Sequence, residues 1–572
     1  MPVEVGMGSQ PVYDVIVVGS GAAGGIACHV LATKGLKVLC LEAGRRIVSG
    51  RDFYTNTFPY GWTYRGSGKP GEYGKLPQGM GWKINEWTDH LYTIPDEDPY
   101  ALAPGAKFTW TRMRVLGGRT NCWGRGTDRF GPLDFKAKSL QDGWGEDWPI
   151  SYDDVAPYYD AVEQFIGVAG STEGVYNTPS GQHLLPTFNP RCGEWLIKKG
   201  AAKLGIKVRP KPLAVLSKPY HGRPACHYCG GCNWGCMVAA RYGSVDSVFP
   251  HLEGRPNFTL RTSAAVHTVL MDPATGKARG VTYIDAENKQ EYEVHGKAVV
   301  LAASMAESIR ILFNSRNRDF PAGLANSSGT LGRYLTEHVA FNSIGGFFPQ
   351  LAGRPTTNDD GPGESVLYIP RYNYGHQDKK KYLRGWRFDF YTGCGMGPGP
   401  GAGLPGFGSA YKKKIKELYP AAFSIGGYGE GLAFDWNYVE IDPGGLRDRF
   451  GIPQVRFHTN AEYPHAYAIR DEMYAQMEEI MKASGAEVFP YKKEAPYPLG
   501  SVTHEAGGTR MGDDPKTSVL DKWNRCHDVK NVVVADAASF VTHPEKQITH
   551  TIMALAYRAS DHLAEEFRRG NV

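Results

Sequence analysis

A single unit near the N-terminus constrains the fold of this chain more than any other feature. Residues 15–18 form a β-branched apolar run that is typical of a buried parallel strand. A glycine-rich turn over 19–24 leads into small and apolar residues over 25–34, which predict a helix. A second apolar run over 37–41 predicts another strand. Strand, glycine turn, helix and strand in this order predict a βαβ unit that binds a dinucleotide.

The chemistry of this unit depends on three glycines and one acid. Gly19, Gly21 and Gly24 stand in a G-x-G-x-x-G pattern. Gly19 permits the tight turn, Gly21 lets the backbone approach a pyrophosphate, and Gly24 allows close packing of helix on strand. Glu42 ends the second strand and can accept hydrogen bonds from ribose hydroxyls. Because an acid at this place favours a free 2′-hydroxyl, FAD or NAD is expected rather than NADP.

Composition excludes several other classes of protein. The 572 residues predict more than one domain, and 41% apolar residues are enough for a large core. A net charge of +5 without long basic runs does not indicate a nucleic-acid partner. The sequence has no basic leader and no long apolar run, so no membrane span is expected. The default location is the cytoplasm, with export on a signal-bearing partner as the alternative.

Periodicity predicts further elements along the chain. The predicted helices are 151–166, with Ser151 as N-cap, and 306–314, 462–484 and 549–568. The predicted strands are 259–269, 280–284, 294–303 and 532–535. Residues 351–410 are rich in Gly, Pro and polar side chains and are expected to be mostly loops.

Four separated segments give the chain a family resemblance. They are the βαβ unit at 14–44, the sequence RVLGGRTNCWG at 114–124, residues 300–315, and a C-terminal set within 504–556 that begins HEAGGTRMG. Together and in this order they resemble the glucose–methanol–choline (GMC) flavoprotein oxidoreductases, most nearly bacterial sugar dehydrogenases and glycoside 3-dehydrogenases. The resemblance implies FAD as the cofactor and removal of hydride from an alcohol as the reaction.

The same resemblance implies an α/β fold, α+β overall, with two interleaved domains. A discontinuous Rossmann-like FAD-binding domain is expected from 1–150, 226–335 and 500–572. A mixed-sheet substrate domain, inserted between these segments, is expected from 151–225 and 336–499.

The catalytic residues are expected in the C-terminal segment. The family's histidine at the start of the HEAGGTRMG segment matches His504, which would take the hydroxyl proton as hydride leaves. A second catalytic position is usually Asn or His in an N-P-T-x-T segment. Matching the shared T-x-T places Gln547 there, which departs from the family by one methylene. His543 and His550 are alternative partners.

The cofactor is expected to contact residues from several segments. Besides the residues of the βαβ unit, these are Gly117, Gly118, Asn121 and Cys122 in the flavin segment and Asp536 after the strand at 532–535. Some sugar oxidases of the family bond a histidine covalently to the flavin just before the tryptophan of this segment. Because Cys122 occupies that position here, FAD is expected to bind non-covalently, with a cysteinyl link as the alternative.

Four cysteines form a compact run at Cys226, Cys229, Cys232 and Cys236. The C-x₂-C-x₂-C-x₃-C spacing is similar to ferredoxin-type sequences and favours an iron–sulfur cluster, either 3Fe–4S or 4Fe–4S. Zinc usually takes two well-separated C-x₂-C pairs, and disulfides are disfavoured without an export signal. Both stay open as alternatives, as do free thiols.

A cluster near the flavin would favour a dehydrogenase that passes electrons to a cytochrome, a quinone or a small carrier subunit. The expected substrate is a sugar or glycoside, with oxidation at C3 as the leading hypothesis; Trp386, Arg387, Asp389 and Tyr391 combine aromatic and hydrogen-bonding groups that suit a sugar ring. One alternative is a pyranose-oxidase-like enzyme that uses O₂ and keeps the cysteines for structure. Another is a flavin-bound protein with no redox role or with weakened activity, which the Gln547 departure leaves open.

Overall fold

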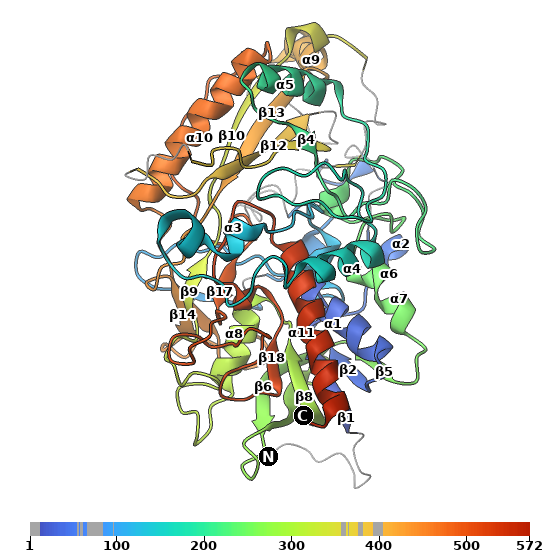
Figure 1. Cartoon of the computed structure of the whole chain (residues 1–572). Coiled ribbons are helices and arrows are strands. Elements are labelled where there is room, and N and C mark those ends of the chain that lie inside the picture. The colour runs from blue at the N-terminus through green and yellow to red at the C-terminus, as the bar shows by residue number, and fades with distance from the viewer. Residues whose placement is uncertain are drawn as a thin grey trace.

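The computed structural model describes residues 12–53, 57, 61–65, 84–94, 96–355, 362–363, 365–375, 381–392 and 404–572. Within these residues the strands form three sheets, and the sheet that carries the βαβ unit lies at the opposite end of the molecule from the one covered by α10 (Pro464–Ala483) (Figure 1).

The first sheet has seven strands in the order β5-β2-β1-β8-β7-β6, with β18 paired to β8. Its parallel part consists of β1 (Tyr13–Val18), β2 (Val38–Leu41), β5 (Phe258–Arg261), β8 (Glu291–Leu301) and β18 (Val532–Val534). The strands β6 (Ala264–Met271) and β7 (Ala278–Asp285) extend it as an antiparallel hairpin. The predicted βαβ unit is therefore confirmed, and strands from three distant parts of the chain complete its sheet.

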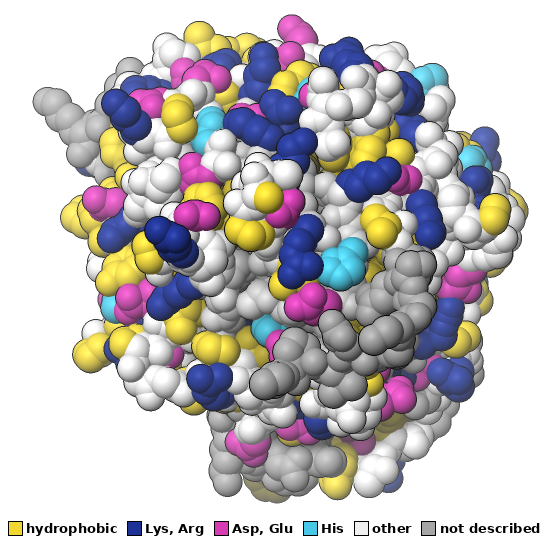
Figure 2. Space-filling model, turned by 90° about the horizontal axis from the view of Figure 1, so that it is seen from below, with side chains coloured by type: hydrophobic (Ala, Val, Ile, Leu, Met, Phe, Trp, Pro, Cys, Tyr) yellow, Lys and Arg dark blue, Asp and Glu magenta, His cyan; other side chains and the backbone are white. Residues whose placement is uncertain are grey.

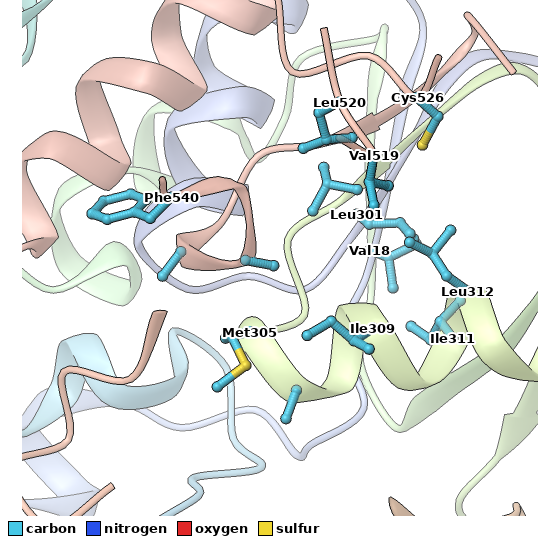
Figure 3. Packing of buried hydrophobic residues seen from close by; sticks show 14 of the residues in the cluster. Val18, Leu301, Met305, Ile309, Ile311, Leu312, Val519, Leu520, Cys526 and Phe540 are labelled. Carbon is cyan, nitrogen blue, oxygen red and sulfur yellow. The ribbon is translucent and has the colours of Figure 1, made fainter. Parts of the chain in front are cut away.

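Helices cover this sheet on both faces, as in other doubly wound folds. The helix α1 (Ala22–Thr33) packs against the C-terminal helix α11 (Thr549–Arg569), so the two ends of the described chain lie side by side (Figure 1). The helix α8 (Met305–Asn314) packs on β6, and its Met305, Ile309 and Leu312 belong to a buried cluster with Val18 and Leu301 of the sheet (Figure 3).

The second sheet has the order β16-β10-β13-β12-β11-β4 and is antiparallel throughout. Its strands are β16 (Glu487–Val488), β10 (Val339–Phe347), β13 (Ala422–Gly429), β12 (Trp386–Thr392), β11 (Leu367–Ile369) and β4 (Arg209–Pro210). The helices α10 and α5 (Cys192–Lys203) pack together over one face of this sheet, and the other face is left toward the centre of the molecule (Figure 1).

A third sheet, ordered β17-β9-β14-β15-β3, joins the other two. Its strands are β17 (Ala506–Gly508), β9 (Arg333–Thr336), β14 (Tyr438–Ile441), β15 (Val455–His458) and β3 (Ala101–Leu102). Because β9 leads directly into β10, the chain passes from this sheet to the second one through only two residues, Glu337 and His338.

The remaining helices are short or peripheral. They are α2 (Ser49–Asp52), α3 (Pro132–Phe135), α4 (Ala156–Ile166), α6 (Ser244–Ser247), α7 (Phe249–Leu252) and α9 (Gly408–Leu418). Single turns occur at η3 (Asp89–Leu91), η4 (Gly118–Asn121), η5 (Lys138–Asp142), η6 (Cys232–Trp234), η7 (Pro349–Leu351) and η9 (Ala537–Ser539).

Three predicted elements differ from the structure. The helix expected from 151 begins only at Ala156, because Ser151 forms a local turn with Asp154 and does not cap α4. The strand expected over 259–269 is two strands, β5 and β6, separated at Ser263, whose φ of 58° is left-handed. Part of the expected loop region 351–410 forms β11 and β12, and the rest lies partly outside the described residues.

Charged side chains of both signs lie on the surface (Figure 2). Basic and acidic side chains are intermixed over the face shown in Figure 2, so neither sign dominates the visible surface there. Among the described residues, no helix has the length and apolar character needed to cross a membrane.

Candidate active site

One large cavity, with a volume of about 720 Å³, runs between the first and second sheets. It begins at the glycine turn after β1, passes the flavin segment at η4, and ends beneath the second sheet at His504 and Gln547. This volume lies within the range of roughly 300–1,000 Å³ that is usual for cofactor and substrate pockets. Of the predicted site residues, the cavity is lined by Gly19, Gly21, Glu42, Gly118, Cys122, His504, Asp536 and Gln547.

The glycine turn at one end of the cavity tolerates no side chain at two positions. Gly19 has φ of 98°, and a Cβ there would lie 2.4 Å from the carbonyl oxygen of Ala302. A Cβ on Gly24 would lie 1.9 Å from the carbonyl oxygen of Gly19, so α1 starts in direct contact with the strand end. Gly21 differs, because its nearest neighbour would be 4.0 Å away, and it lines the cavity. The contacts of Gly19 and Gly24 are those expected of a tight turn and of close helix packing, whereas the approach of a pyrophosphate to Gly21 stays a prediction.

A chain of hydrogen bonds joins the glycine turn to the flavin segment. The amide of Gly117 donates to Ser20 Oγ over 2.8 Å, and the Ser20 hydroxyl donates to Glu42 Oε2. The other oxygen of Glu42 accepts from the amide of Gly44 at 2.8 Å. Burial raises the pKa of Glu42, although these hydrogen bonds act in the opposite direction. The carboxylate predicted to meet a ribose is thus fixed in place at the cavity wall.

The flavin segment is stabilised by its own asparagine. Asn121 is buried, and its Nδ2 donates to the carbonyls of Leu116 and Gly118, both at 2.9 Å. Gly118 and Cys122 then face the cavity, whereas Gly117 and Asn121 do not line it. Asn121 therefore shapes the loop that a cofactor would contact.

Asp536 lines the cavity and lies two residues after the end of β18. Its carboxylate accepts from the Ser308 hydroxyl at 2.5 Å and from the amide of Ala538 at 3.0 Å. Burial raises the pKa of this group to about 6. The guanidinium of Arg119, which also lines the cavity, forms an ion pair with Glu505 at 2.7 Å. This stretch combines fixed acceptors and one cation, which suits the polar linker of a dinucleotide.

His504 stands at the far end of the cavity on a turn that Glu337 holds from behind. One oxygen of Glu337 accepts from the amide of Gly500 at 2.5 Å, and the other accepts from the amide of His504 at 2.7 Å. The preceding residue, Thr503, has a left-handed φ of 63°. Such strained backbone persists only where the surroundings enforce it, and it is frequent at active sites. The carbonyl of His504 accepts from Nε2 of His543 at 2.7 Å.

Gln547 also lines the cavity and lies near His504, because the ring of His338 contacts the carbonyl of Lys546 at 3.2 Å and Nδ1 of His504 at 3.1 Å. Its amide lies against Gly126: a Cβ at that position would be only 1.5 Å from Gln547 Oε1. The absence of a side chain at Gly126 therefore provides the space for the longer Gln at the position where the family usually has Asn.

The second sheet closes this end of the cavity with hydroxyl and aromatic groups. Adjacent strands contribute Ser343 from β10, Ser424 and Tyr428 from β13, and Tyr391 from β12. Tyr497 and Asn233 lie on the wall as well. Many hydroxyl and amide groups around aromatic rings suit a polyhydroxylated ligand.

Other predicted residues lie behind this lining. His543 contacts the main chain of His504, and burial lowers its pKa to about 4. His550 is fully buried, bonds to the carbonyl of Thr127 at 2.9 Å and has a pKa lowered by burial to about 3. Neither lines the cavity. Both positions fit neutral histidines that stabilise the surroundings of the site.

Among the four residues predicted to contact a sugar, Tyr391 reaches the cavity. Trp386 points into the core beneath α10, while Arg387 and Asp389 pair with each other at 2.7 Å in a buried ion network. Alternation along β12 places Trp386 on the face opposite to the other three residues. On the shared face, Arg387 and Asp389 are occupied by their ion pairs, and Tyr391 lines the cavity.

The cysteine run lies close to the cavity, whose wall includes Asn233 from this run. Cys232 and Cys236 are buried, Cys226 and Cys229 are half-buried, and all four are free thiols. In the described part of the chain no group of three or more His, Cys, Asp or Glu is arranged to hold a metal ion. This arrangement does not support the iron–sulfur cluster that the spacing favours, nor the zinc alternative. The four thiols nevertheless lie near one another, because burial and then the nearby Cys232, Cys229 and Cys236 raise the pKa of Cys226.

Several residues of the site were missed by sequence reasoning. Glu337 and His338 come from the two-residue connection between β9 and β10, and Gly126, Ser343, Ser424 and Tyr428 belong to no motif. The only available signal was a lone Glu-His pair after the short RYLT stretch, which has no specific meaning without the fold.

The cavity fits FAD. It offers a glycine turn that excludes side chains, a buried carboxylate at the second strand end, and polar groups on the same wall as His504. Gly21 and Gly118 bring backbone to the cavity surface, where a flat or charged group can approach closely.

Comparison with known proteins agrees with this arrangement. The N-terminal sequence model of the GMC oxidoreductases matches residues 13–340, and the C-terminal model of the same family matches residues 434–556.

Three curated relatives are each 27% identical to the chain and align with 97% of it. They are the fructose dehydrogenase large subunit of Gluconobacter japonicus, of which 98% is covered; 2-methyl-1,2-propanediol dehydrogenase of Mycolicibacterium austroafricanum, 95%; and paromamine 6′-oxidase of Streptomyces fradiae, 91%.

Solved structures share the fold. Formate oxidase of Aspergillus oryzae RIB40 matches with a TM-score of 0.63 and 15% identity, covering 98% of this chain and 100% of that one. Pyridoxine 4-oxidase from Mesorbium loti matches with a TM-score of 0.60 and 18% identity, covering 97% and 99%.

Proposed function

Because the chain belongs to the GMC oxidoreductase family of FAD-dependent enzymes that act on CH–OH groups, we propose that it oxidises a secondary hydroxyl of a sugar or glycoside. The observation that carries this proposal is the lining beneath the second sheet, where Ser343, Ser424, Tyr391 and Tyr428 line the same cavity as His504 and Gln547. The curated relatives named for fructose and for paromamine support a sugar-type substrate.

Oxidation of a hydroxyl needs a base that accepts its proton and a hydrogen-bond donor that stabilises its oxygen. When bound, FAD supplies the acceptor for the hydride that leaves the carbinol carbon. His504 takes the hydroxyl proton on its ring as the C–H and O–H bonds break and the C=O bond forms. The amide of Gln547 lies at the same end of the cavity and donates to the substrate oxygen, which gains negative charge as its proton leaves.

The cofactor is expected to be held without a covalent bond. Burial raises the pKa of the Cys122 thiol to about 11, so it stays protonated at neutral pH. Because the thiolate and not the thiol is the nucleophile, this environment disfavours a cysteinyl link. Acid precipitation should release all flavin into the supernatant; yellow colour retained by the pellet would contradict this part of the proposal.

We favour a dehydrogenase that delivers electrons to an external acceptor, with oxidation at C3; two of the curated relatives are named dehydrogenases. No step is routed through the cysteine run, since the described residues include no group of ligands arranged to hold a metal. The test is turnover of a panel of methyl glycosides with a dye acceptor under argon and with O₂ alone, followed by identification of the ketone carbon by NMR. Fast dye reduction with a 3-keto product supports the proposal; fast peroxide formation with O₂ alone, or a ketone at another carbon, contradicts it.

A further inference from the structure

The connection between β9 and β10 places a third histidine, His338, directly behind His504. His338 is 4% exposed and does not line the cavity. Its ring lies 5.1 Å from the ring of His504 and 4.3 Å from that of His543, centroid to centroid. It is thus buried among the residues that support the catalytic turn, without access to a substrate.

The hydrogen bonds of His338 define which of its nitrogens carries the proton. Its Nε2 lies 3.0 Å from the carbonyl oxygen of Pro544 and 3.2 Å from that of Lys546. A carbonyl oxygen can only accept, so Nε2 must carry the hydrogen. Burial, together with the neighbouring His543 and His504, lowers the pKa of His338 well below its ordinary value. The ring is therefore neutral near pH 7, and its Nδ1 holds a lone pair.

The lone pair on Nδ1 of His338 determines which ring nitrogen of His504 carries the hydrogen. Nδ1 of His338 lies 3.1 Å from Nδ1 of His504. Since the His338 nitrogen is the acceptor, Nδ1–H of His504 must be the donor. A neutral imidazole carries one ring hydrogen, so the lone pair of His504 is on Nε2.

We infer that His338 is a positioning residue that fixes His504 in the tautomer with a basic Nε2. The chain of contacts runs from two backbone carbonyls through His338 to His504, without any carboxylate. Once Nε2 has accepted the substrate proton, the Nδ1–H of His504 becomes a charge-assisted donor to the neutral His338, which stabilises the imidazolium. The inference rests on the proposed function for the direction of proton transfer, whereas the tautomer itself does not depend on it.

The tautomer can be measured in the resting wild-type protein. In ¹⁵N-histidine-labelled enzyme, ring nitrogen shifts distinguish a protonated from a bare nitrogen, and spectra of His504→Asn and His338→Asn assign the signals. The expected result is Nδ1–H for His504 and Nε2–H for His338. A protonated Nε2 on His504 would overturn the inference, even if no substrate had yet been found.

The rate of flavin reduction tests whether His338 positions His504. His338→Leu removes the acceptor at similar volume, and His338→Asn keeps an acceptor oxygen in place of Nδ1. Misplacing a reacting group by about 1 Å can cost about 10²-fold, so we expect His338→Leu to slow reduction by about 10- to 100-fold with unchanged KM. His338→Asn should recover part of the loss.

The matched control is His465→Leu on α10, a half-buried histidine whose pKa is also lowered by burial, to about 4. It accepts from the amide of Leu383 and does not line the cavity, so reduction should proceed at the wild-type rate. Equal rates for the two His338 variants and wild type would refute the positioning role. Wild-type flavin that no sugar reduces would instead count against the proposed function.

Discussion

Replacing Gly126 by Ala should displace Gln547 without touching the cofactor. The added Cβ would lie 1.5 Å from Gln547 Oε1, and this atom is the end of a side chain, so the amide must rotate away while the backbone stays. Gly126 does not line the cavity, and FAD content should therefore be normal.

The size of the effect follows from the bond that is lost. A hydrogen bond to a charged group contributes about 1.5–3 kcal/mol, and the substrate oxygen gains charge as its proton leaves. Losing the Gln547 amide should lower the rate constant for flavin reduction by roughly 10- to 150-fold. Stopped-flow absorbance under anaerobic conditions measures this rate with the best glycoside of the panel.

A double-mutant cycle separates this mechanism from a general disturbance. If Gly126→Ala acts only through the amide, it should have no further effect in a Gln547→Ala background. The control is Gly50→Ala in α2, where a Cβ would have no neighbour within 4 Å. Reduction at the wild-type rate in Gly126→Ala, or additive losses in the double variant, would refute the proposed role of Gln547.

Three further outcomes are expected. His504→Ala should slow flavin reduction by about 10²- to 10⁴-fold while FAD stays bound, as the flavin-to-protein ratio would show; an unchanged rate would exclude His504 as the base. Gly24→Ala should lower FAD content and thermal stability, because its Cβ would lie 1.9 Å from the carbonyl oxygen of Gly19; normal values of both would contradict the close packing described for α1. Stability against urea should fall as the pH drops from about 6.5 to 4, since His543 has a folded pKa of about 4 and the unfolded chain binds its proton first. Because of this one group, the free energy of unfolding is about 3 kcal/mol larger above pH 6.5 than below pH 4. His543→Asn should therefore make the free energy of unfolding less dependent on pH. An equally steep dependence in that variant would refute the assignment.

The βαβ unit and its glycines were predictable because their roles are local. Gly19 and Gly24 stand within six residues of each other, and the clash that each would cause involves the turn itself or the neighbouring strand. His504 and Asp536 were predictable for another reason: their segments match a family pattern, and both line the cavity. In these cases the sequence carries the relevant constraint within one short stretch.

The setting of His504 could not be predicted in this way. Glu337 and His338 are more than 160 residues away from it in the chain, with separations of 167 and 166, and only the passage from β9 to β10 brings them behind the turn. The cysteine spacing is insufficient for a related reason. Spacing gives the order of ligands along the chain, whereas a metal site requires that the ligands converge, and in the described part of the chain no group of three or more is arranged in this way.

Anaerobic titration of the wild-type enzyme with glycosides tests the central claim most directly. If the cavity end at His504 oxidises a sugar hydroxyl, the flavin absorbance should bleach in proportion to added substrate, with one equivalent of ketone formed per flavin. His504→Ala, loaded with the same amount of FAD, should bleach far more slowly. Flavin that keeps its full absorbance with every glycoside of the panel would contradict the account.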